Sequence, residues 1–163
     1  MNYEIRKETE CGWNIYSVYN TETGNRVNYF ATEEEAQAFI ARKQRIVTAA
    51  INNILDSRLN VVWSWGLHNK RAITDGVRFD VQGFKFTGEV KITLDFARSH
   101  ASKKSTFKVQ IGDDVSTGIT AEELIDFIDE RVEKVDNYEE AVKASMTPEE
   151  FAFAQSVGQV IFI

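Results

Sequence analysis

The segment that most constrains the fold is Val77–Phe96, where apolar and polar residues alternate almost without interruption. Strict alternation of this length indicates β-strands with one buried face and one solvent-exposed face. A two-residue loop at Gln82-Gly83 divides the segment into a hairpin, with Asp80 opposite Lys85 and all apolar pairs on one face. The sequence therefore predicts a sheet whose apolar row, from Phe84 onward, forms the floor of the core.

Length and composition favour one soluble globular protein. The 163 residues are 43% hydrophobic and contain a single Pro. We expect no membrane span because no apolar run approaches eighteen residues, and no signal peptide because the N-terminus is polar. Cys11 is the only cysteine, so no internal disulfide can form, which is typical of the cytoplasm. The two histidines, His68 and His100, are far apart, and we expect no zinc centre and no cofactor.

The first 58 residues predict short strands followed by one long helix. The strand candidates, separated by turn-forming residues, are Tyr3–Arg6, Trp13–Tyr19 and Arg26–Phe30. Thr32 and Glu35 form a capping box, after which apolar residues recur at helical spacing to about Asp56. The pattern of Trp13, Thr23-Gly24, Phe30 and Thr32–Ala36 resembles short strand-strand-helix modules of small bacterial and phage proteins, and this resemblance assigns no functional residue.

The rest of the chain predicts more strands and then helices. The strand candidates are Leu59–Trp65, the Val77–Phe96 hairpin and Thr106–Ile111, with polar connections at 66–75 and 98–105. The helix candidates begin at Thr120, where Glu123 completes a second capping box, at Tyr138, and at Pro148. Val160–Ile163 is either an edge strand or a docked apolar tail.

This order of elements predicts an α+β fold, with a mostly antiparallel, twisted sheet packed on one long helix and acidic helices in the C-terminal third. We expect a single domain over residues 1–163. It comprises a strand-strand-helix portion (1–58), antiparallel strands (59–112), and an acidic helical portion with an apolar tail (113–163).

Catalytic chemistry finds little support in the residue pattern. Asp80 followed by Glu89 and Lys91 matches the residue types of a metal-dependent nuclease hairpin, in which two carboxylates share a divalent ion. The two-residue loop, however, separates Asp80 from Glu89 by on the order of 13 Å at strand rise, which favours a solvated strand face. Neither histidine has a Ser, Cys or carboxylate at a recognisable catalytic spacing. We therefore expect a protein that is not an enzyme.

Charge is distributed unevenly along the chain. Residues 1–112 carry a net charge of +4 and residues 113–150 a net charge of −10. The acidic candidates for partner binding are Glu122, Glu123, Asp126, Asp129, Glu130 and Glu133. One interpretation is the solvated side of an amphipathic helix. Our leading hypothesis is a regulatory surface that binds a basic protein, as an inhibitor encoded by a phage or mobile element would.

Nucleic-acid binding is the alternative hypothesis. It uses the two polar connections, whose candidate residues are His68, Lys70, Arg71, Arg98, His100, Lys103 and Lys104. Trp63 and Trp65 would provide stacking surfaces for bases, although indole rings at alternating strand positions are more often part of a core. The sequence leaves the oligomeric state open.

Overall fold

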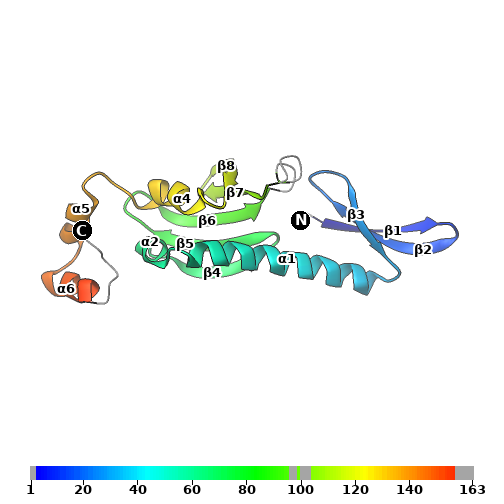
Figure 1. Ribbon diagram of the computed structural model, residues 1–163, viewed down its shortest axis with the longest axis horizontal. Helices are drawn as coiled ribbons and strands as arrows, with labels where there is room; N and C mark the ends of the chain where they lie inside the picture. The colour runs from blue at the N-terminus through cyan, green and yellow to red at the C-terminus, as the bar shows by residue number, and fades with distance from the viewer. Residues whose placement is uncertain (1–2, 96–98, 100–103, 157–163) are drawn as a thin grey trace.

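The computed structural model describes residues 3–95, 99 and 104–156. Within them the chain forms two antiparallel sheets, one of three strands and one of five, together with helices, which confirms the predicted α+β class. One long helix, α1 (Glu33–Asp56), runs along both sheets and connects them (Figure 1).

The three-stranded sheet consists of β1 (Tyr3–Glu10), β2 (Trp13–Asn20) and β3 (Arg26–Phe30), in that order. All three predicted strands are present, and the first two extend beyond their predicted ends. A small core lies between this sheet and the first half of α1. It consists of the buried Tyr3, Val18 and Ala36, with Ile5, Tyr16, Phe30, Phe39 and Ile40 packed around them.

Helix α1 begins and ends where the sequence predicts. The Thr32 side chain accepts a hydrogen bond from the Glu35 amide, and the Glu35 carboxylate accepts one from the Thr32 amide, each at 3.3 Å. This reciprocal capping box satisfies two amides that have no partner within the helix. The last third of α1 buries Ile51 and Leu55 in the core of the five-stranded sheet. One helix therefore contributes to two separate cores.

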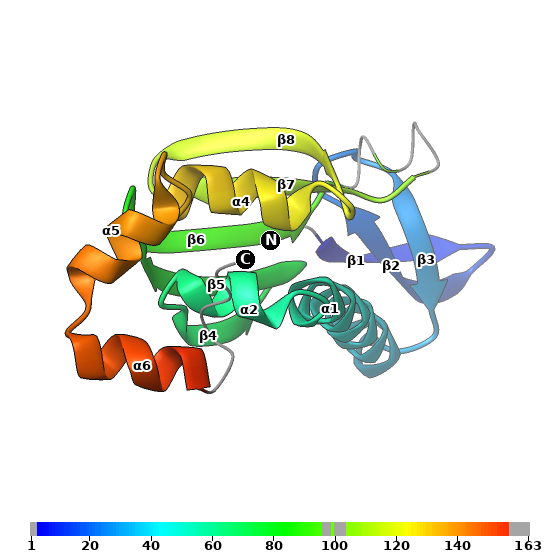
Figure 2. The ribbon, with the colours of Figure 1, turned by 60° about the vertical axis from the view of Figure 1, so that its left-hand side comes forward.

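The five-stranded sheet has the order β4-β5-β6-β7-β8. Its strands are β4 (His68–Ile73), β5 (Gly76–Gln82), β6 (Thr87–Leu94), β7 (Thr106–Ile111) and β8 (Asp114–Thr120). The remaining helices are α2 (Leu59–Ser64), α4 (Leu124–Val132), α5 (Tyr138–Ser145) and α6 (Pro148–Ser156). Helices α1, α2 and α4 share one core with a single face of the sheet (Figure 2).

The predicted hairpin is present, but its predicted register is wrong. Gln82 pairs with Thr87 and Asp80 pairs with Glu89, so the connection spans residues 83–86 and Asp80 does not face Lys85. The partner of Asp80 is displaced by four residues, an even number, so the buried and exposed faces remain as predicted. Phe84, predicted in the core floor, instead lies in the loop with 43% of its surface exposed.

Two further segments differ from their predicted structures. Leu59–Trp65, predicted as a strand, forms helix α2 with Trp65 as its C-terminal cap. Side chains two residues apart point to nearly opposite sides of a helix. Trp65 is therefore fully buried, whereas Trp63 is 57% exposed. Residues 66–75, predicted as a polar connection, contain edge strand β4. Pairing with β5 favours extended backbone there despite a polar sequence.

The helix of the acidic segment begins four residues later than predicted, at Leu124 rather than Thr120. Thr120 ends strand β8, and α4 begins at Leu124. Only half of the predicted capping box forms, because the Glu123 carboxylate accepts from the Thr120 amide at 3.1 Å while no side chain caps α4. Among the described residues, no helix is both long and apolar enough to cross a membrane. The predicted tail Val160–Ile163 lies outside the described residues.

Candidate functional site

A cavity of about 720 Å³ lies where four separate segments meet. Its walls are α2, the loop between β5 and β6, the C-terminal end of α4, and α5. We call it the acidic aromatic pocket, after its carboxylate and aromatic side chains: Trp63, Phe84, Asp129, Glu133, Tyr138 and Glu139.

The β5–β6 loop is fixed against α4 by backbone hydrogen bonds. The carbonyl oxygen of Val132 accepts from the amides of Lys85 at 2.9 Å and Phe86 at 3.3 Å. The Lys85 ammonium donates to the carbonyl of Glu130 at 2.8 Å. These bonds satisfy carbonyls at the end of α4 that lack partners within the helix. At Gly83 the two backbones are so close that a Cβ would lie 2.1 Å from the Val132 oxygen.

Glu133 connects the loop, α4 and α5. Its residue surface is only 5% exposed, and its carboxylate accepts from the Phe84 amide at 3.0 Å and from the Tyr138 hydroxyl at 2.9 Å. Burial raises the pKa of Glu133, and the two hydrogen bonds only partly oppose this shift. Burial, with the nearby Glu133 carboxylate, raises the pKa of Tyr138 to about 12. Tyr138 therefore remains a neutral donor.

Asp129 supports the same wall from one turn earlier in α4. Its carboxylate accepts from the Trp65 indole Nε1 at 2.9 Å, which provides a partner for the polar atom of a fully buried ring. Trp65 in turn stacks on Phe79, with ring centroids 6.4 Å apart. Asp129 thus connects the pocket to the centre of the larger core.

The pocket also exposes aromatic surface. Trp63 is 57% exposed and Phe84 is 43% exposed, and the Phe84 ring meets Tyr138 edge to face with centroids 6.0 Å apart. Aromatic faces and carboxylates both attract cations. A carboxylate offers about four acceptor sites, so Asp129, which is half-buried, keeps capacity for a ligand beyond its bond to Trp65. The arrangement is suited to an ammonium or guanidinium group.

The six predicted acidic residues have different environments. Asp129 and Glu133 line the pocket, whereas Asp126 forms an ion pair with Arg58 at 2.7 Å. Glu122 lies 3.9 Å from Lys104, and Glu123 and Glu130 are exposed. The sequence reasoning missed Trp63, Phe84, Tyr138 and Glu139 as pocket residues. No local pattern marks these four residues, because they come from α2, the β5–β6 loop and α5 and meet only in the folded chain.

The alternative nucleic-acid candidates are only partly described. His68, Lys70 and Arg71 lie on the exposed edge strand β4, and the His68 Nδ1 is 2.8 Å from the carbonyl oxygen of Gly66. Lys104 lies near the start of α4 through its contact with Glu122. Arg98, His100 and Lys103 lie outside the described residues. Trp65 is buried, so the predicted pair of stacking tryptophans does not form.

The expected separation of Asp80 from Glu89 is also wrong, because the observed register makes the two residues direct cross-strand partners. Both carboxylates have other partners. Glu89 forms ion pairs with Arg78 and with Lys91, and Asp80 accepts from the Asn69 amide at 3.1 Å. In the described part of the chain, no group of three His, Cys, Asp or Glu side chains is arranged to hold a metal ion.

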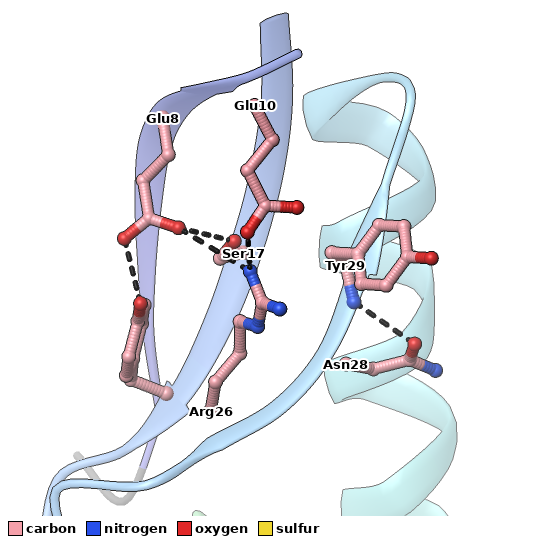
Figure 3. A network of polar contacts seen from close by, with 7 residues as sticks. Glu8, Glu10, Ser17, Arg26, Asn28 and Tyr29 are labelled. Atoms are coloured by element: carbon pink, nitrogen blue, oxygen red, sulfur yellow. Dashed lines mark hydrogen bonds and ion pairs between the residues drawn. The ribbon is translucent and has the colours of Figure 1, made fainter.

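A second polar network lies on the face of the three-stranded sheet that points away from α1 (Figure 3). Glu8 accepts from the hydroxyls of Ser17 and Tyr19, each at 2.6 Å. Arg26 lies 2.8 Å from Glu10 and 3.8 Å from Glu8. Arg26 neutralises one of the two carboxylates, and its contacts with both connect β3 to β1, so the network stabilises the pairing of the strands.

No protein-family model, curated protein or solved structure matches this chain.

Proposed function

We propose that this protein is a non-enzymatic binding protein that accepts a cationic side chain of a basic partner protein in the acidic aromatic pocket. The observation that carries the proposal is the convergence of carboxylates and aromatic rings on one cavity. The carboxylates are those of Asp129, Glu133 and Glu139, and the rings are those of Trp63, Phe84 and Tyr138.

An arginine side chain matches this chemistry best. Its planar guanidinium stacks on aromatic faces and donates several hydrogen bonds in a fixed geometry, and it is less strongly hydrated than an ammonium. Trp63 offers the exposed ring, while Glu139 offers an exposed carboxylate on α5. Lys134 is the one basic residue in the described lining, so the pocket keeps an excess of negative charge.

The surrounding segment supports long-range attraction of such a partner. Residues 113–150 carry a net charge of −10, and a surface of one sign accelerates association with a partner of the opposite sign. Binding should therefore weaken as salt is added, because ions screen exposed charges beyond about 8 Å at physiological ionic strength. A regulator that occupies the basic surface of a nucleic-acid-binding protein would behave in this way.

The test is titration with an oligo-arginine peptide, followed by tryptophan fluorescence and calorimetry at low and physiological salt. We expect saturable binding that is weakened by combining Trp63→Ala with Glu139→Gln. Trp63→Ala alone should cost about 0.5–2 kcal/mol of binding free energy, the range of a cation–π contact.

The matched control combines Trp13→Ala with Glu149→Gln. Trp13 is 76% exposed on the three-stranded sheet, and Glu149 is exposed at the start of α6, so the control removes the same groups from elsewhere. It should bind the peptide as the wild type does. Equal losses in both double variants would show only general attraction to an acidic protein and would refute the pocket.

A further inference from the structure

The five-stranded sheet has a second face that its helices do not cover. The buried residues of β5 and β6, such as Phe79 and Ile92, point into the core shared with α1, α2 and α4. The residues between them point to the opposite side, and no helix of the described chain packs there. Figure 2 shows the helices gathered on one side of this sheet. We call the other side the open sheet face.

Basic residues form a row across the open sheet face. Arg71 on β4 is the cross-strand partner of Arg78 on β5, and Arg78 is the partner of Lys91 on β6. Lys108 on β7 pairs with Thr93 and is therefore a diagonal neighbour of Lys91. Adjacent strands lie about 4.8 Å apart, so the first three residues span roughly 10 Å.

Such a row is costly for the folded protein by itself, because like charges directly opposite one another in a sheet repel. Glu89 is shared between Arg78 and Lys91, and Lys108 lies 4.0 Å from Glu22 in the turn between β2 and β3. The described residues provide no ion pair for Arg71. The side chains of Arg78 and Lys91 remain about one third exposed, at 33% and 36%, so their charges are accessible.

We propose that the open sheet face binds the phosphate backbone of a duplex nucleic acid. Its cations match a repeating array of phosphates, and their repulsion would be relieved by anions that lie along the row. Single strands are usually held by aromatic rings that stack on bases, whereas the cross-strand neighbours of this row are not aromatic: they include Thr93, Gln110 and Val115. Asp80 and Glu89 share the face, and the four cations outnumber them. Contacts to the backbone alone confer affinity without sequence preference.

The open sheet face is neither the pair of polar connections at 66–75 and 98–105 nor the acidic segment 113–150. It uses Arg71 from the edge strand, but Arg78, Lys91 and Lys108 come from the interior of the sheet, where the alternation of apolar and polar residues places them on one side. It also lies on the opposite side of the sheet from α4 and the acidic aromatic pocket.

The test is fluorescence anisotropy of a labelled 20-base-pair duplex of arbitrary sequence, titrated with the full-length protein over a series of low salt concentrations. The expected result is weak binding without sequence preference. Combining Arg71→Gln with Lys91→Gln should reduce the slope of log affinity against log salt by about 2, since each phosphate contact contributes about 0.9.

The matched control combines Arg42→Gln with Arg45→Gln, which removes the same charge from the exposed middle of α1. It should retain the wild-type slope, and circular dichroism should show that both double variants are folded. Three outcomes would overturn the proposal: no binding at the lowest salt, equal loss in the two variants, or tighter binding to a single strand of the same length.

Discussion

Gly83→Ala is the substitution that tests the geometry of the pocket most directly. An added Cβ would lie 2.1 Å from the Val132 carbonyl oxygen and 2.7 Å from its Cγ1. Side chains do not tolerate contacts below 3.0 Å, so the loop and the end of α4 must separate by about 1 Å. Closely packed interiors resist displacements of that size.

The cost follows from the hydrogen bonds that this separation disrupts. The Val132 oxygen accepts from the amides of Lys85 and Phe86, and each such bond contributes about 0.5–1.5 kcal/mol net. Overpacking by one carbon atom typically adds about 1–3 kcal/mol of strain. Because the loop is short and partly exposed, some of this strain relaxes. We expect the free energy of unfolding to fall by about 2–4 kcal/mol.

Urea unfolding followed by circular dichroism measures this change, and the midpoint should fall while the m-value stays constant. The control is Gly12→Ala, because Gly12 has open space around its Cα but a φ of +82°. Its cost should be about 1–2 kcal/mol, from the left-handed backbone alone. If Gly83→Ala lies within about 0.5 kcal/mol of the wild type, α4 does not pack against the loop as described, and the pocket does not have these walls.

Three other substitutions test the pocket, the larger core and the start of α1. Burial raises the pKa of Glu133. Its contribution to stability is therefore full below the unfolded-state pKa and is lost as pH rises through the folded-state pKa. In thermal unfolding across pH 4–8, Glu133→Gln should reduce this loss of stability with pH, and a pH profile identical to that of the wild type would contradict the prediction. Phe79→Ala removes a ring that is 1% exposed and should cost about 3–5 kcal/mol in urea unfolding; a loss below about 1 kcal/mol would contradict its burial. Thr32→Ala removes the cap of α1 and should cost about 1 kcal/mol, with Thr32→Ser as the control that restores it.

Long local patterns predicted their elements well. Helix α1 was correct at both ends because its capping box and its apolar periodicity extend over 24 residues, and each signal supports the other. The alternation of Val77–Phe96 correctly predicted which side chains of β5 and β6 are buried, because a register shift by an even number of residues leaves each side chain on the same face. The same parity could not distinguish a two-residue loop from the observed loop at 83–86. That choice depends on Val132, which is distant in sequence.

The sequence did not predict the structure of short segments or the site that is built from several segments. Leu59–Trp65 alternates over seven residues, which a strand and a short helix can both satisfy, and the burial of Trp65 against Phe79 decides for the helix. The pocket brings together α2, the β5–β6 loop, α4 and α5. Two of its acids, Asp129 and Glu133, were among the predicted residues, but Glu139 and the aromatic rings meet them only through tertiary packing, so no local signal linked the two groups.

The acidic aromatic pocket and the basic row lie on opposite sides of the five-stranded sheet. Asp129, Glu133 and Glu139 line the pocket on the helical side of the five-stranded sheet, and the basic row lies on the open sheet face. Because the sheet stands between them, the two proposed surfaces should respond independently to substitution, as distant sites generally do. Arg71→Gln with Lys91→Gln should therefore leave oligo-arginine binding unchanged, and Trp63→Ala with Glu139→Gln should leave duplex binding unchanged. If either double variant impairs both activities while remaining folded, the two surfaces are one site, and the assignment of separate partners is wrong.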